Sequence, residues 1–185
     1  MTLIKSISGI RGTIGGKTAE NLTPIDAVKF AAAFGAFIKQ RNKGKKKITI
    51  VIGRDARISG NMISSLVANT LVGLAIDVID LGLSTTPTVE VAVPMEHADG
   101  GIIITASHNP KQWNALKLLN EKGEFLNGAE GEQILEIADN EDFEFFHWRD
   151  FMSKISSDTI INEHSIGVIY ADGAIMNGSS GGSLF

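Results

Sequence analysis

Gly101-Ile102-Ile103-Ile104 runs without a break into Thr105-Ala106-Ser107-His108-Asn109-Pro110. The apolar run predicts a buried strand, so the polar loop lies at its carboxyl end, where open α/β sheets place ligands and reacting groups. A second apolar run covers residues 115–119. A parallel crossover needs a dozen residues or more and roughly ten join these runs, so we expect the second strand to be antiparallel and the sheet to be mixed.

Around this pair of strands the chain alternates between segments typical of helices and of strands. Thr23-Pro24 and Thr86-Pro87 predict the starts of two helices, and Ser59 and Asn127 are expected to cap two others. Strands are expected over residues 48–52, 77–81, 101–105 and 115–119. This order favours an α/β fold, in which helices are layered on a sheet of about four strands.

The composition excludes several classes of protein. The 185 residues suffice for one domain with a core, and 43% hydrophobic with 21% charged residues is typical of a globular protein. A net charge of -4 argues against nucleic acid as a partner, and the lack of cysteine excludes disulfides and zinc–thiolate sites. No apolar stretch is long enough for a membrane span and no secretory signal is present, so we expect no membrane partner and a cytoplasmic location.

Three common enzyme signatures also fail. Gly12-Thr13-Ile14-Gly15-Gly16-Lys17-Thr18 resembles a phosphate-binding P-loop, but its first glycine stands one residue too close and Pro24 interrupts the helix that must follow. No Gly-x-Gly-x-x-Gly follows a strand, and Ser107 lacks the flanking glycines of a hydrolase elbow. The histidines have no metal-ligand spacing. An ATPase, a dehydrogenase and an esterase are therefore excluded.

Chemically active side chains gather around the polar loop. Ser107 has a hydroxyl group and His108, the next residue, has an imidazole. Lys117, in the next apolar run, has a cationic amine. A hydroxyl nucleophile with a cation nearby is what transfer of a phosphoryl group requires. Because Lys117 alternates with apolar neighbours, the alternative is a strand lysine that faces solvent, and we favour the functional interpretation.

Four segments together resemble domain I of the α-D-phosphohexomutases, the family of phosphoglucomutase, phosphomannomutase and phosphoglucosamine mutase. They are Ser8-Gly9-Ile10-Arg11-Gly12, Gly53-Arg54-Asp55-Ala56-Arg57-Ile58-Ser59-Gly60, Gly82-Leu83-Ser84-Thr85-Thr86-Pro87 and Thr105-Ala106-Ser107-His108-Asn109-Pro110. The resemblance implies a three-layer α/β/α sandwich with a small mixed sheet, belonging to an enzyme whose four domains surround a cleft.

The resemblance also implies roles for individual residues. Ser107 would be the phosphoserine that exchanges a phosphoryl group with a hexose 1- or 6-phosphate through a bisphosphate intermediate. Lys117 and Arg11 match positions that approach the phosphoserine and assist proton transfer, and His108 would orient it or donate to its oxygens. Ala115 stands where the family usually has glycine, so we expect a slightly different backbone there.

The family binds Mg²⁺ through the phosphoserine, here Ser107, and an Asp-x-Asp-x-Asp loop of the second domain that this chain does not contain. We expect residues 1–140 to form domain I, 141–166 an aromatic-rich linker or packing segment, and 167–185 a flexible Gly/Ser-rich tail. Without domains II–IV, the chain is expected to be an inactive part of a longer mutase. The alternative is a stand-alone, non-catalytic domain that binds phosphosugars or a protein partner.

The sequence leaves two interpretations open for Arg11, and two for the charged group Arg54, Asp55 and Arg57. Arg11 is expected on a glycine-flanked loop, where structural and functional roles are equally compatible with the sequence. Arg54, Asp55 and Arg57 place a carboxylate between two guanidiniums, which favours a clasp within the loop or a contact to a neighbouring domain.

Overall fold

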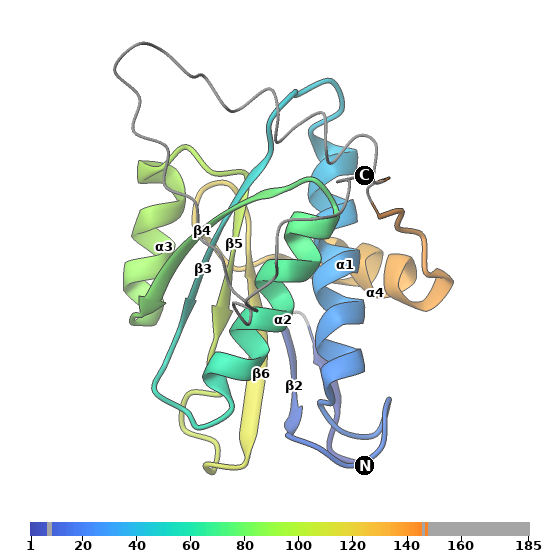
Figure 1. Ribbon diagram of the computed structural model, residues 1–185, viewed down its shortest axis with the longest axis vertical. Coiled ribbons are helices and arrows are strands. Elements are labelled where there is room, and N and C mark those ends of the chain that lie inside the picture. The colour runs from blue at the N-terminus through green and yellow to red at the C-terminus, as the bar shows by residue number, and fades with distance from the viewer. Residues whose placement is uncertain (7–8, 146, 148–185) are drawn as a thin grey trace, which may run out of the picture.

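Strand β5 (Gly100–Ile104) lies inside a sheet, as the apolar run predicts, and each of its residues is buried. The computed structural model describes residues 1–6, 9–145 and 147. Within that part of the chain the sheet has six strands in the order β1-β2-β6-β5-β3-β4 (Figure 1). The other three predicted strands are β3 (Thr49–Arg54), β4 (Asp77–Leu83) and β6 (Trp113–Leu119).

The mixed sheet predicted from the short connection is confirmed. Strand β6 runs antiparallel to β5, with Ile103 opposite Lys117, while β3 is parallel to both β5 and β4. The loop after β5 therefore leads directly back along the same sheet, and the residues at its two ends stay close together.

The sheet is wider than the prediction of about four strands, which is wrong by two. Strands β1 (Ile4–Ser6) and β2 (Gly9–Thr13) pair antiparallel with each other, and β2 pairs with β6. Glycine is depleted in strands, so the presence of Gly9 and Gly12 makes β2 difficult to predict from the sequence. Gly9 is needed here, because its φ is 119° and a Cβ would lie 2.1 Å from the Leu116 carbonyl oxygen.

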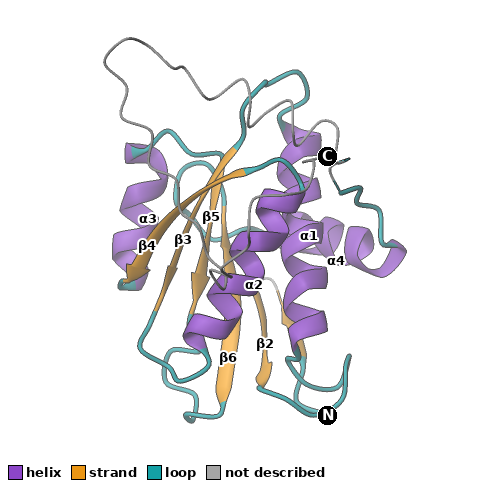
Figure 2. Cartoon of the chain, viewed as in Figure 1, coloured by secondary structure: helices purple, strands orange, loops and turns teal. Residues whose placement is uncertain are grey.

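Helices cover both faces of the sheet, which confirms the three-layer α/β/α sandwich (Figure 2). They are α1 (Pro24–Arg41), α2 (Gly60–Gly73), α3 (Thr86–Met95) and α4 (Gly128–Asn140). Helices α1, α2 and α4 share the larger core cluster with Ile50 and Ile52 of β3. Val51 points to the other face and packs against Val89 and Val93 of α3. Because successive strand residues point to opposite faces, β3 is buried on both sides.

The helix starts are mostly as predicted. Thr23 and Asn127 each form a capping box, and the Thr85 side chain accepts from the backbone of α3. Ser59 is the N-cap residue of α2, as predicted, but its backbone is helical rather than extended and its side chain makes no capping bond. Ser59 Oγ instead accepts from Asn114 Nδ2 at 2.9 Å, which ties the start of α2 to β6.

Aromatic residues follow α4, where the composition changes. Phe143 packs against the larger core cluster, and its ring meets Phe145 edge-on with centroids 5.9 Å apart. Most of the expected 141–166 segment and all of the expected 167–185 tail lie outside the described residues, so the division at residue 140 stays a prediction.

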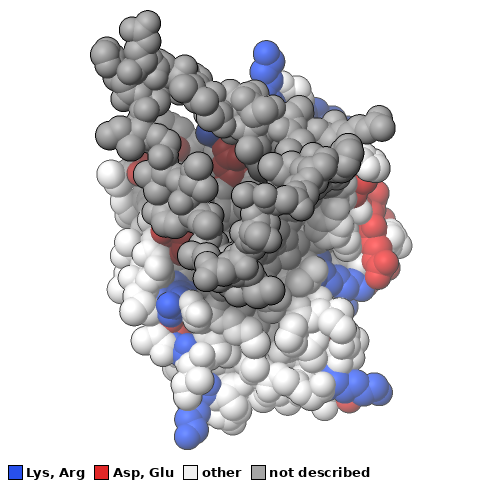
Figure 3. All heavy atoms as spheres, in the orientation of Figure 1, with Lys and Arg blue, Asp and Glu red and all other residues white. Residues whose placement is uncertain are grey.

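Charged side chains are scattered over the face drawn in Figure 3, where described Lys and Arg residues lie among Asp and Glu. No helix in the described part of the chain is long and apolar enough to cross a membrane.

Candidate active site

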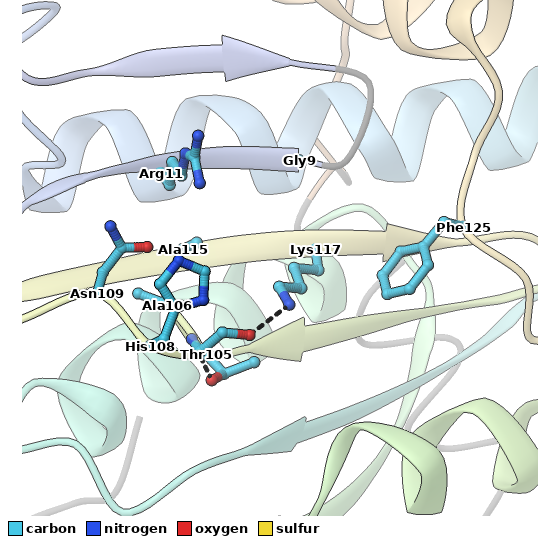
Figure 4. Close-up of a pocket in the computed structure, with 10 residues that line it drawn as sticks. Gly9, Arg11, Thr105, Ala106, His108, Asn109, Ala115, Lys117 and Phe125 are labelled. Carbon is cyan, nitrogen blue, oxygen red and sulfur yellow. Dashed lines mark hydrogen bonds between the residues drawn. The ribbon is translucent and has the colours of Figure 1, made fainter.

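A cavity of about 190 Å³ lies at the carboxyl end of β5 (Figure 4). One liquid water occupies roughly 30 Å³, so the cavity has room for a phosphoryl group. It is lined by Gly9, Arg11, Thr105, Ala106, Ser107, His108, Asn109, Ala115, Lys117 and Phe125. All four residues expected at the site from the sequence are therefore brought to one cavity: Arg11, Ser107, His108 and Lys117.

Lys117 reaches the serine directly. Its Nζ donates a hydrogen bond to Ser107 Oγ over 3.0 Å and lies 5.8 Å from the centre of the Phe125 ring. The antiparallel register sets this contact, because Lys117 stands opposite Ile103, four residues before Ser107 in the chain. The Lys117 amine thus points into the cavity rather than away from it (Figure 4).

Arg11 occupies strand β2, so its expected place on a loop is wrong. It pairs with Ala115 of β6, and side chains of paired residues point to the same face of a sheet. Ala115 and Lys117 also share a face, being two residues apart, so the register places both cations on one side. The Arg11 Nε is buried and, among the described residues, is the one buried side-chain nitrogen or oxygen without a hydrogen-bond partner. A buried donor of this kind is costly unless an acceptor completes it.

Ala115 shows that this position requires no glycine. It lies within β6 opposite Arg11 and is absent from the residues with positive φ. An extended strand residue tolerates a Cβ, so Ala115 is unstrained here, and a small difference from the backbone of the family stays a prediction.

The backbone of Ser107 has an unusual conformation. Its φ is 52°, in the left-handed region that residues other than glycine adopt at a cost. The Ser107 N–H donates to Thr105 Oγ1 over 3.0 Å, and Thr105 Oγ1 donates in turn to Asp55 Oδ2 over 2.5 Å. The loop therefore holds the serine in a conformation it would not adopt alone. His108 lies beside it in the cavity lining.

The interpretation of Asp55 as a carboxylate between two guanidiniums is correct only for Arg57. Arg57 Nε donates to Asp55 Oδ2 over 3.1 Å, whereas Arg54 Nη1 donates to the backbone oxygen of Asp55 over 3.4 Å. The remaining donors of Arg57 reach the loop that contains Ser107. No sequence pattern signals this contact, since its acceptors are backbone carbonyls.

The cavity is electropositive. Its lining contains two cationic side chains, Arg11 and Lys117, and no carboxylate. Such a lining suits an anion with several acceptor oxygens. Mg²⁺ prefers carboxylate and other oxygen ligands, so the cavity by itself does not supply a complete set of ligands, and no group of three or more His, Cys, Asp or Glu residues in the described part of the chain could hold a metal ion.

The fold and the site together define an α/β/α domain that holds a serine hydroxyl against an amine in a cationic cavity. Residues 3–145 match the family described as phosphoglucomutase/phosphomannomutase, alpha/beta/alpha domain I. The chain belongs to this family.

Individual relatives support this assignment. A phosphoglucomutase/phosphomannomutase of Thermococcus kodakarensis is 38% identical over 141 residues, which cover 75% of this chain and 30% of that protein. A phosphoglucosamine mutase of Alkaliphilus metalliredigens is 39% identical over 137 residues, covering 74% and 29%. The crystal structure of a phosphoglucomutase/phosphomannomutase family protein from Burkholderia thailandensis matches with a TM-score of 0.64 and 26% identity, covering 77% of this chain and 31% of that one. The chain thus spans about 30% of the length of such relatives.

Proposed function

We propose that this chain is the nucleophile-bearing domain of a phosphohexomutase, in which Ser107 carries the phosphoryl group that passes between hexose 1-phosphate and 6-phosphate. The observation that carries the proposal is the 3.0 Å hydrogen bond from Lys117 Nζ to Ser107 Oγ inside a cationic cavity. The names of the relatives cover glucose, mannose and glucosamine phosphates, so the proposal is made for hexose phosphates as a class.

In the proposed reaction, Ser107 Oγ attacks the phosphorus of a hexose bisphosphate. An Oγ–P bond forms, the bond between phosphorus and the sugar oxygen breaks, and the serine proton ends on the departing sugar oxygen. The Lys117 ammonium group stabilises negative charge on Oγ and on the bound phosphoryl group. Two unit charges about 4 Å apart attract by roughly 4 kcal/mol at an effective dielectric near 20, so this contact is worth a large part of the catalytic effect.

Arg11 and His108 have supporting roles in this proposal. The unpaired Nε of Arg11 would donate to a phosphoryl oxygen, which completes the one buried donor left open in the described part of the chain. His108 would orient the phosphoserine or donate to its oxygens. Catalysis would then consist mainly of placement and charge neutralisation, as phosphoryl transfer generally requires.

The proposal for the whole enzyme includes Mg²⁺ bound to the phosphoryl group on Ser107. Because the cavity lining contains no carboxylate, the other ligands would come from domains II–IV of a longer protein, together with most of the sugar site. The phosphorylated Ser107 would then be the one ligand that the cavity itself offers to the metal.

Intact-mass spectrometry after incubation with glucose 1,6-bisphosphate tests the proposal. The chain should gain the mass of one phosphoryl group, which fragmentation should place on Ser107. Ser107→Ala should abolish the gain, whereas Ser65→Ala, which removes an exposed serine of α2, should not.

A mass gain that persists in Ser107→Ala would contradict the proposal. Calorimetric binding of the bisphosphate without any gain in mass would instead support a non-catalytic phosphosugar-binding domain.

A further inference from the structure

The Arg57 guanidinium group is hydrogen-bonded to the backbone of the loop that carries Ser107. Its Nη1 donates to the carbonyl oxygens of Pro110 and Trp113 over 2.8 and 2.9 Å, and its Nη2 to those of Ser107 and Asn109 over 2.7 and 2.8 Å. With the bond from Nε to Asp55, five hydrogen bonds use all five donors of the guanidinium.

We infer that Arg57, together with Asp55, positions Ser107 for phosphoryl transfer, an inference that rests on the proposed function. The network fixes both peptide groups that flank the serine. Arg57 holds the Ser107 carbonyl, while Asp55 holds the Thr105 hydroxyl, which accepts from the Ser107 N–H. Rotation about the Cα–Cβ bond is then the main freedom left to the Ser107 hydroxyl, and Lys117 restricts that rotation.

These hydrogen bonds account for the left-handed backbone conformation of Ser107. A serine with φ of 52° persists only where its surroundings over-determine the conformation, and here the hydrogen-bonded Arg57 guanidinium does so. The Arg57 side chain is 11% exposed, and its carboxylate partner Asp55 accepts in turn from the Arg57 backbone N–H over 3.0 Å. Arg57 and Asp55 therefore hold each other in place.

The hydrogen bonds of Arg57 also favour the binding of an anion at Ser107. Four carbonyl oxygens between residues 107 and 113 accept from Arg57, and two of them belong to the cavity-lining residues Ser107 and Asn109. The guanidinium group compensates their partial negative charge, which would otherwise repel a phosphoryl group on the serine. A lysine could not replace Arg57, because a compact ammonium group has three donors and lacks the planar fork.

Arg57→Lys and Arg57→Met, compared with the unaltered chain, test this inference. We expect phosphoryl transfer from glucose 1,6-bisphosphate to Ser107 to slow by about a hundredfold in both variants, because a misplacement of about 1 Å has that effect. The donor concentration at half-saturation should change by less than about twofold, since Lys117 and Arg11 remain in place. Amide hydrogen exchange should accelerate over residues 106–113 and not in the helices.

Arg41→Met is the matched control, because it removes an arginine at the end of α1 that forms an ion pair with Glu130 and lies outside the cavity lining. It should leave both transfer and loop exchange unchanged. Transfer by Arg57→Lys at the unaltered rate, or loop exchange in the Arg57 variants equal to that in Arg41→Met, would overturn the inference. If the unaltered chain accepts no phosphoryl group, the proposed function fails, whereas the exchange rates still decide whether Arg57 orders the loop.

Discussion

Ser107 combines a reactive position with a backbone conformation that is costly for any residue with a Cβ. Its φ of 52° lies in the left-handed region, in which glycine is at ease. Conformations of this kind cluster at functional sites, where the surrounding contacts maintain them. The loop therefore stores local strain next to the hydroxyl group.

This strain predicts a difference between two substitutions that both remove the hydroxyl. Ser107→Gly should be more stable than Ser107→Ala by about 1 kcal/mol, because glycine adopts a positive φ without the Cβ penalty. Urea unfolding of the two variants measures the difference, and both lose the bond from Lys117 equally. Equal stability of the two variants would show that the loop is not strained.

Lys117 is the charged residue that donates to the serine hydroxyl, and its removal should affect the chemistry more than the fold. We expect Lys117→Met to slow phosphorylation of Ser107 by about a hundredfold or more, as the loss of one positioned donor does in other enzymes. The rate of mass gain with glucose 1,6-bisphosphate measures this. Lys122→Met removes the same charge from an exposed turn outside the cavity lining, so a similar loss in that variant would contradict the assignment.

At the scale of elements, one acidic residue near the start of α4 both caps that helix and ties it to α1. Glu130 accepts from the Asn127 N–H over 3.0 Å and forms an ion pair with Arg41 of α1. Burial raises the pKa of the Glu130 carboxyl, but the Asn127 hydrogen bond and the Arg41 guanidinium outweigh it, so the pKa is lowered from its ordinary value of 4.5. The ionised carboxylate thus stabilises the folded chain at pH above 4.5, and this contribution is lost as the pH falls through the lower, folded-state pKa.

Glu130→Gln should therefore destabilise the chain by about 1 kcal/mol at neutral pH and by less in acid. Urea midpoints of both chains, measured from neutral pH downwards, should converge below pH 4.5. Glu132→Gln, which changes an exposed residue of the same helix, should run parallel to the unaltered chain at every pH. A constant gap between Glu130→Gln and the unaltered chain would refute the role of the ionised carboxylate.

Most elements were predictable because their signals are local. Apolar runs marked β3 and β5, and Thr23 and Asn127 marked helix starts by chemistry that acts within three residues. Strand β2 carried no such signal, because its glycines are chosen for the close approach of β6 rather than for strand propensity. The position of the Ser59 cap was predictable, but its side-chain bond was not, since the partner Asn114 lies far away in the sequence.

The candidate site was predictable in part. Ser107, His108 and Lys117 belong to one loop and the strand that follows it, so their proximity follows from a short connection. Arg11 comes from a strand at the other end of the chain, and only the resemblance to known mutases brought it to the site. The hydrogen bonds from Arg57 to the loop of Ser107 could not be predicted, because backbone carbonyl groups are present in every residue and give no signal in the sequence.

At the scale of the whole molecule, the chain corresponds to about 30% of the length of its relatives. It presents exposed apolar side chains at Ile58, Leu83 and Met95, which are 89%, 65% and 70% exposed. Apolar side chains exposed singly in this way are normal on a protein surface. In the proposed enzyme, domains outside this chain would supply the metal ligands and most of the sugar contacts.

The isolated chain should therefore accept a phosphoryl group and still show no sustained conversion of glucose 1-phosphate to glucose 6-phosphate. A coupled assay with a dehydrogenase that consumes glucose 6-phosphate measures this conversion, with a full-length relative as the positive control. Repeated turnover by the chain alone would contradict the proposal that the other domains are required.

Lys117 lies on β6, and Ser107 lies on the loop that joins β6 to β5, two strands fixed by the pairing of Ile103 with Lys117 and Ile104 with Leu116. If this domain moved, both groups would move with it. In the proposed reaction, a sugar bearing two phosphates would turn over in front of a serine oxygen and an amine that belong to one rigid element pair. Reorientation would then be left to the sugar, and the attacking group would meet each end of it in the same electrostatic surroundings.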